Sequence, residues 1–248
     1  MEASTPRNDD PISRSISFAT GLDPGFADVL EPATADDIAE LQALTGNPPA
    51  PMHLAFLRHM GRNADWLQLR RVDFSIEAVI RFLAEDRWRP PTSYALIGID
   101  EGESACHAYL QDHGDTQPVV GIPDLEGLPE EELGKWIGYE AGSLPELICR
   151  QALRMFVINP MPWRSTLTMR DANAGVLDTV GRIAAFAGLE KLWFSTSFGV
   201  HCRGEDLALS ATQPPGYAMA IAIGAATEAA RNQLVAALCG ELDLLIKA

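Results

Sequence analysis

Few residues of this sequence combine the type and the spacing that catalysis requires. His53 and His59 are six residues apart, which is not the spacing that puts two metal ligands on one face of a helix. Cys106 and His107 are neighbours in a predicted strand, so their side chains point to opposite faces and cannot pair directly as nucleophile and base. His113 lies in the turn sequence DHGD, where a turn residue is a better interpretation than a metal ligand or a base. We therefore expect no catalytic residue, no metal site and no cofactor.

The absence of the common phosphate-binding motifs also argues against a nucleotide cofactor. Neither G-x-G-x-x-G nor G-x-x-x-x-G-K-[ST] occurs in the sequence. Trp66, Trp88, Trp136 and Trp163 are better interpreted as core or interface aromatics than as groups that stack on a cofactor.

Acidic residues are the most distinctive feature. The chain has 34 acidic and 19 basic residues, a net charge of −15, which argues against nucleic-acid binding and favours a cationic partner or high solubility. Between Asp100 and Cys149 there are twelve acidic residues against one basic residue, Lys135. Most of them fall in predicted turns and a loop, so they could form one negative face that binds a partner. The residues expected there are Asp100, Glu101, Glu103, Asp112, Asp115, Glu130, Glu131 and Glu132. A solvated surface that only keeps the protein soluble is the alternative.

Cysteine usage and hydropathy indicate the compartment. The four cysteines form no C-x-x-C pair, so we expect reduced and mostly buried thiols. The beginning of the chain lacks an apolar stretch of signal-peptide type, and the run YAMAIAIGAA is too short to span a bilayer. A cytoplasmic protein is the expectation.

The N-terminal half begins with predicted helices. Residues 1–30 have few clustered apolar residues, and we expect a loosely ordered arm. A helix should follow Thr34, with Asp37 completing a capping box. A second helix should begin at Pro51 and end at Gly61 in a left-handed conformation. The sequence IEAVIRFLAEDRW predicts a third.

Strands follow. SYALIGI, SACHAYL and QPVVGI predict a three-stranded antiparallel meander, and a helix should begin at Ser143 with Glu146 in a capping box. The sequence NPMPW, beginning at Asn159, marks a boundary. Beyond it we expect a helix over AGVLDTVGRIAAFAG, three strands (KLWFSTSF, DLALSA and YAMAIAI) and a final helix from about Ala225. The prediction is an α+β protein with helices packed on an antiparallel sheet over 31–158, and a smaller C-terminal α/β subdomain packed on it over 159–248.

The string PATADDIAELQALTGNPPAPMHLAFLRHMG resembles the opening of the SUKH superfamily, which contains fungal cell-wall-assembly regulators and bacterial immunity proteins. YALIGIDEGESACHAYL is similar to the central strands of that family, and AGSLPELI to its closing helix, so the resemblance covers about residues 30–155. The residues that carry the opening match are Pro32, Ile38, Leu41, Pro51, Phe56, Leu57 and Gly61.

The resemblance implies partner binding rather than chemistry. The leading hypothesis is a non-enzymatic immunity protein that binds and neutralises a toxin, such as a cationic nuclease, without binding nucleic acid or a membrane. A regulatory or scaffolding protein that binds a cellular partner is the alternative, and an enzyme that uses Cys106, His107 or His113 has the least support.

Overall fold

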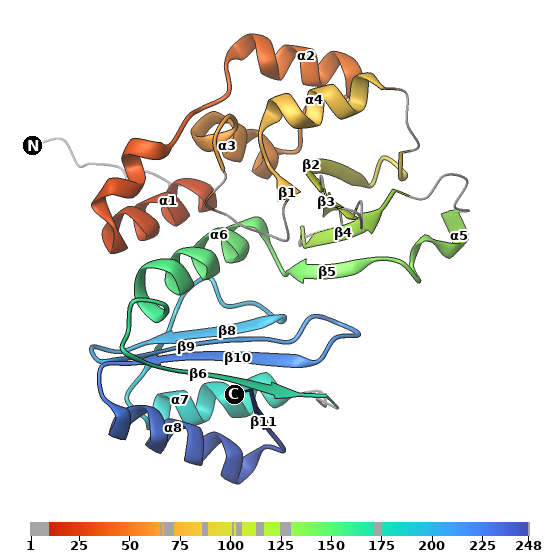
Figure 1. The fold of residues 1–248 in the computed structure, drawn as a ribbon. Helices are drawn as coiled ribbons and strands as arrows, with labels where there is room; N and C mark the ends of the chain where they lie inside the picture. Colours follow the sequence, from red (N-terminus) through yellow and green to blue (C-terminus); the bar gives the residue numbers. More distant parts are fainter. Residues whose placement is uncertain are drawn as a thin grey trace, which may run out of the picture.

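The protein is an α+β structure with two antiparallel sheets (Figure 1), which confirms the predicted fold class. The computed structural model describes residues 10–64, 66, 72–85, 89–100, 102, 106–112, 117–124, 130–170 and 175–247. The five-stranded sheet has the order β1-β2-β3-β4-β5, and the six-stranded sheet has the order β11-β6-β10-β9-β8-β7.

The first sheet extends the predicted meander by one strand on each side. Its strands are β1 (Val72–Asp73), β2 (Tyr94–Asp100), β3 (Cys106–Gln111), β4 (Val119–Pro123) and β5 (Gly138–Ala141), and every neighbouring pair is antiparallel. The helices that precede or accompany it are α1 (Pro11–Leu22), η1 (Pro24–Val29), α2 (Ala35–Thr45), α3 (Pro51–Met60), α4 (Ile76–Ala84), the short α5 (Glu130–Leu133) and α6 (Leu144–Leu153).

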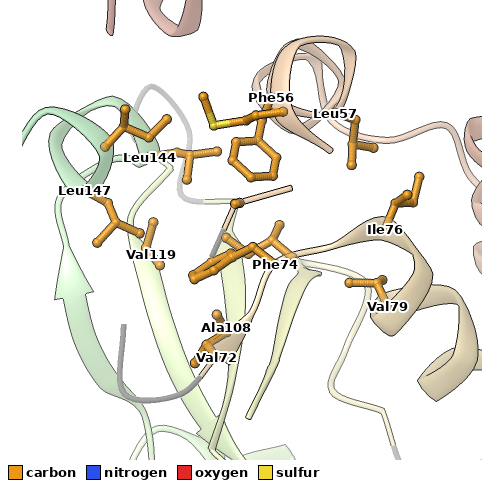
Figure 2. Close-up of a cluster of buried hydrophobic side chains, with 14 of the residues drawn as sticks. Phe56, Leu57, Val72, Phe74, Ile76, Val79, Ala108, Val119, Leu144 and Leu147 are labelled. Carbon is orange, nitrogen blue, oxygen red and sulfur yellow. The ribbon is translucent and has the colours of Figure 1, made fainter. Parts of the chain in front are cut away.

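A hydrophobic core lies between these helices and the sheet. Figure 2 shows Phe56 and Leu57 of α3 beside Phe74, and Leu144 and Leu147 of α6 near the strands. All five side chains are at most 2% exposed. The apolar spacing within α3 therefore does what the sequence predicted, because it buries one face of a helix against the sheet.

Residues 11–29 are not the loose arm that the sequence analysis predicted. Asp10 caps α1 by accepting hydrogen bonds from the backbone of Ile12 and Ser13 at 2.9 and 3.0 Å. Ile12 and Ala19 are fully buried, and α1 packs against α6. The expectation missed the helical spacing of Ile12, Ile16 and Ala19, and it could not show their packing partner, α6, which lies more than a hundred residues away in the sequence.

The helix ends agree with the prediction except at Gly61. Thr34 and Asp37 form the expected capping box, and Gly46 ends α2 in the left-handed conformation with φ of 71°. Gly61 has φ of −68°, so the predicted left-handed ending of α3 is wrong. A side chain is excluded there by crowding, since a Cβ atom would lie 2.7 Å from the carbonyl oxygen of Leu57 and 2.9 Å from the Cβ of Ala33.

The C-terminal half contains more strands than the sequence predicted. After η3 (Arg154–Ile158), a π-helical segment, come β6 (Trp163–Met169), α7 (Val176–Phe186), β7 (Glu190–Lys191), β8 (Gly199–Arg203), β9 (Leu207–Thr212), β10 (Met219–Ala225), α8 (Glu228–Glu241) and β11 (Leu245–Lys247). The strand predicted over KLWFSTSF is wrong, because only Lys191 of that segment lies in a strand, β7, and β8 begins only at Gly199.

The second sheet is covered on both faces. Figure 1 shows α7 and α8 on one side of it and α6 on the other. Leu209 and Ile221 belong to the core cluster shared with α7 and α8, whereas Ala208 packs in a cluster with Cys149 and Leu153 of α6. Helix α6 also contributes Leu147 to the core of the first sheet, so it connects the two halves. No helix within the described ranges is long and apolar enough to cross a membrane.

Candidate functional site

Among the described residues, Asp112 and the acidic residues of α5 lie at opposite ends of the first sheet. In the β3–β4 pair, Cys106 lies opposite Pro123 and Leu110 lies opposite Val119. The turn after β2 and the connection after β4 are therefore at one end of the sheet, while Asp112, which follows β3, is at the other. The backbone of Asp112 also donates a hydrogen bond to the carbonyl of Ser93, just before β2, at 2.7 Å. The strands thus separate Asp112 from the acidic residues of α5.

Asp100 is a structural residue rather than a surface one. It is 4% exposed, and its carboxylate accepts hydrogen bonds from the backbone N–H groups of Gly102 at 2.7 Å and Cys106 at 3.1 Å. An aspartate at the end of a strand commonly folds back onto the following turn in this way. Its carboxylate is therefore engaged within the turn, and its predicted contact with a partner remains a prediction.

The remaining predicted contact residues fall into three groups. Glu101, Glu103 and Asp115 lie outside the described residues. Glu130 begins α5, and Glu131 and Glu132 follow it with exposed side chains. Asp112 is exposed at the opposite end of the sheet.

An exposed tryptophan lies just beyond the α5 glutamates. Trp136 is 51% exposed, and its backbone N–H donates to the carbonyl of Leu133 at 2.9 Å, in the turn that ends α5. Lys135 is 3.7 Å from Glu132, an exposed pair that contributes little to stability. The segment from Glu131 to Trp136 therefore presents two carboxylates and a large aromatic ring to solvent, and we call it the α5 surface.

The predicted candidates for chemistry include a buried histidine, His107, whose Nε2 lies 4.0 Å from Asp124 Oδ2. The Nδ1 atom of His107 accepts a hydrogen bond from the backbone of Asp100 at 3.1 Å, and its ring packs on Phe82 with centroids 4.5 Å apart. Cys106 is partly exposed, and His113 lies outside the described residues. In the part of the chain that the structure describes, no three His, Cys, Asp or Glu side chains are arranged to hold a metal ion.

The sequence analysis missed a buried polar cluster between α6 and the second sheet. His201 of β8 and Ser210 of β9 are cross-strand partners, and His201 Nδ1 lies 3.0 Å from Ser210 Oγ. On its other side, His201 Nε2 lies 3.3 Å from Glu146 Oε1 of α6. Thr196 Oγ1 donates to Glu146 Oε2 at 2.6 Å, as does the backbone of Gly142 at 2.7 Å. Both oxygens of Glu146 therefore have partners: Oε1 contacts His201 in the second half, and Oε2 accepts from Thr196 in the second half and from Gly142 just before α6.

Local sequence explains how the cluster fits. Residues at alternate positions of a strand share a face, so His201 and Gly199 lie on the same side of β8. A Cβ atom at Gly199 would lie 2.6 Å from Glu146 Oε1 and 2.7 Å from His201 Nε2. Glycine at this position therefore leaves the space that the Glu146–His201 contact occupies.

The charge states follow from burial and hydrogen bonding. Burial alone would raise the pKa of Glu146, but the hydrogen bond with His201, the charge of Arg150 3.8 Å away and the Thr196 hydroxyl together hold it below its ordinary value. Burial lowers the pKa of His201, and the bond to Glu146 only partly opposes this. A neutral His201 that donates from Nε2 to the Glu146 carboxylate must accept at Nδ1, so Ser210 is the donor there.

This cluster has the residue types of a nucleophilic triad but no access for a substrate. Glu146 and His201 are fully buried and Ser210 is 4% exposed. A serine, a histidine and a carboxylate activate a nucleophile only where the hydroxyl can reach the substrate. The arrangement can therefore hold α6 against the second sheet, and it cannot perform acyl transfer in this conformation.

Sequence signals for the cluster were present but weak. Glu146 was assigned to a capping box, and the structure bears out half of it: Ser143 accepts from the backbone of Glu146 at 3.1 Å, while the Glu146 side chain turns to His201 instead. His201 and Ser210 occupy matching positions in two short apolar runs, GVHCR and LALSA. Pairing them requires the register of β8, which the sequence analysis did not predict.

In comparisons with family models and with curated proteins, the sequence matches none.

Proposed function

We propose that the protein is a non-enzymatic binding module whose α5 surface contacts a cationic protein. The observation that carries this proposal is the exposure of Trp136, four residues after Glu132 in the same short segment as the exposed carboxylates of Glu131 and Glu132. Tryptophan is the residue type most enriched among interface residues that dominate binding energy, and nearby charges steer a partner of opposite sign. The net charge of −15 adds a long-range attraction for such a partner.

The resemblance to the SUKH superfamily, which contains bacterial immunity proteins, suggests which biological process this binding would serve. An immunity protein that covers the active site of a toxin needs no catalytic group of its own. Carboxylates that imitate a phosphate backbone suit a cationic nuclease domain as the partner. We therefore propose toxin neutralisation in the cytoplasm as the function, with the α5 surface as the contact.

The experiment begins with a candidate partner. Purified domains encoded by the neighbouring genes are screened for binding to the protein, and association with any that bind is followed by surface plasmon resonance from 50 to 500 mM NaCl. Trp136→Ala should weaken binding by roughly thirtyfold or more, the loss typical of an interface hot spot. Glu131→Gln combined with Glu132→Gln should slow association and flatten its dependence on salt, because exposed charges act mainly through steering.

A matched control separates the α5 surface from total charge. Glu40→Gln combined with Glu205→Gln removes two exposed carboxylates elsewhere, on α2 and in the β8–β9 turn. If both pairs of substitutions change association equally and Trp136→Ala binds normally, the α5 surface is not the contact. A partner that is captured but has no toxic activity would contradict the immunity role and support regulation or scaffolding.

A further inference from the structure

A second feature of the first half is unrelated to the α5 surface. A cavity of about 270 Å³ lies between the end of α2, the start of α3, the end of α4 and the beginning of β2. Its walls are largely apolar and include Leu41, Phe82, Leu83 and Leu96. An apolar cavity of roughly 150 Å³ already accommodates benzene, so this one has room for a ring with substituents.

One wall of the cavity is a polar side chain without a partner. His53, in the first turn of α3, lines the cavity and is only 3% exposed. Among the described residues its ring nitrogens make no hydrogen bond, yet they are not completely buried, and its ring centroid lies 6.5 Å from that of Phe56. The ring nitrogens are therefore available to a ligand in the cavity, whose polar group would complete their hydrogen bonding.

The other polar groups restrict the charge of an occupant. Arg89 also lines the cavity, but its guanidinium donates to the backbone carbonyls of Leu44 and Leu83. Burial lowers the pKa of His53 to about 4, so its imidazole is neutral at pH 7 and offers one donor and one acceptor. Asp112 also lines the cavity, so an anion would meet a carboxylate and a cation would meet the Arg89 guanidinium, and either would lose solvation against the apolar part of the wall.

We infer that this cavity binds a small, uncharged aromatic molecule with one hydroxyl or N–H group, which hydrogen-bonds to His53. Small-molecule sites usually have this composition, an apolar enclosure with a few polar groups that fix the orientation of the ligand. The site is independent of the proposed partner surface, because its lining comes from the helices and the Asp112 end of the sheet.

The test uses phenol, indole, benzene and benzoate as probes of the ¹⁵N-labelled protein. Amide resonances of the cavity lining should shift on titration with phenol or indole, with saturation in the millimolar range or below. Benzene, which has the shape without the polar group, should bind about tenfold more weakly than phenol, the value of one hydrogen bond. Benzoate should bind more weakly still.

Two variants distinguish the site from non-specific binding. His53→Phe keeps an aromatic ring but removes both nitrogens, so it should lose the preference for phenol over benzene. Ala95→Phe, at a half-buried wall position, should block all four probes without altering His53. Ala237→Phe is the matched control, since Ala237 lines a different hollow between α7 and α8 and should leave phenol binding unchanged.

Three results with the unsubstituted protein, and one with a variant, would overturn the inference. The first is the absence of shifts in the cavity lining at 10 mM phenol and indole. The second is equal affinity for phenol and benzene in the unsubstituted protein, and the third is tighter binding of benzoate than of phenol. Retained phenol preference in a folded His53→Phe variant would also remove His53 from the site.

Discussion

Glu146 Oε1 of α6 lies 3.3 Å from His201 Nε2 of β8, although the two residues are 55 positions apart in the sequence. Both side chains are fully buried. Helix α6 also packs into the core of the first sheet through Leu147. This contact is therefore a polar connection between a helix of the first half and the sheet of the second. It fixes the relative position of the two halves more specifically than apolar packing alone would.

Glu146→Gln should lower the free energy of unfolding by about 2–4 kcal/mol, because it removes the charge that faces Arg150 and disturbs the bond with His201. Chemical denaturation in urea measures the change. A double-mutant cycle with His201→Gln should give a coupling of about 1 kcal/mol or more, since the two side chains are in direct contact. Glu228→Gln on the exposed start of α8 is the control and should change stability by less than about 0.5 kcal/mol. Equal effects of the two glutamate substitutions would show that the buried contact contributes nothing particular.

Gly199→Ala should be destabilising by about 1–3 kcal/mol, because the added methyl would occupy the space between Glu146 and His201. Gly240→Ala near the end of α8 is the control, since a methyl there meets no atom within 4 Å, and it should be neutral or slightly stabilising. Thermal unfolding of the two variants provides the comparison. If Gly199→Ala leaves the thermal stability unchanged, the cluster has room to rearrange and the glycine is not required for the contact.

The sequence was a good guide wherever structure depends on neighbours along the chain. The capping box of Thr34 and Asp37, the start of α3 at Pro51 and the β2–β3–β4 meander are all local patterns of caps, prolines and alternation, and each is present in the structure. The α+β class follows from these elements. The end of α3 shows the limit of such local patterns. Gly61 does end the helix, but a glycine is required because neighbouring atoms leave no room for a side chain, and not because of its backbone conformation.

The candidate sites depend on contacts between distant segments, and the sequence therefore predicted them poorly. The charge count could not show that antiparallel pairing separates Asp112 from α5, nor that Asp100 turns inward to close a turn. His201 and Ser210 become neighbours only through the register of two strands, one of which was not predicted. His53 was weighed only as a metal ligand paired with His59, and nothing in its local sequence indicates that it lines a cavity.

The buried His53 should make the protein less stable below neutral pH. Its folded pKa of about 4 lies below the ordinary histidine value of 6.5, so between these values the unfolded chain binds a proton that the folded protein does not. Its contribution is fully present above about pH 6.5 and is lost as the pH falls towards 4. Since one pH unit in this window is worth about 1.4 kcal/mol, the loss attributable to His53 is about 3 kcal/mol.

Urea denaturation of the protein and of His53→Phe at pH 7, 5.5 and 4 checks this expectation. The variant should lose about 3 kcal/mol less than the unsubstituted protein between pH 7 and pH 4. His201, whose pKa burial also lowers, titrates in the same direction but is present in both proteins, so the difference isolates His53. Parallel stability profiles would show that His53 is protonated in the folded protein or is reached by water.

Helix α1 should be an integral part of the fold, as the burial of Ile12 requires. Ile12→Ala removes a fully buried side chain and should lower the free energy of unfolding by about 2–4 kcal/mol, the usual cost of truncating a core isoleucine. Phe186→Ala is the matched control: it removes a larger side chain, but one that is 97% exposed at the end of α7, and it should change stability by less than about 0.5 kcal/mol. Both values come from urea titrations of the full chain under the same conditions. A loosely attached arm would give the opposite order, with Ile12→Ala no more costly than the surface substitution, and would return residues 11–29 to the peripheral role that their composition suggested.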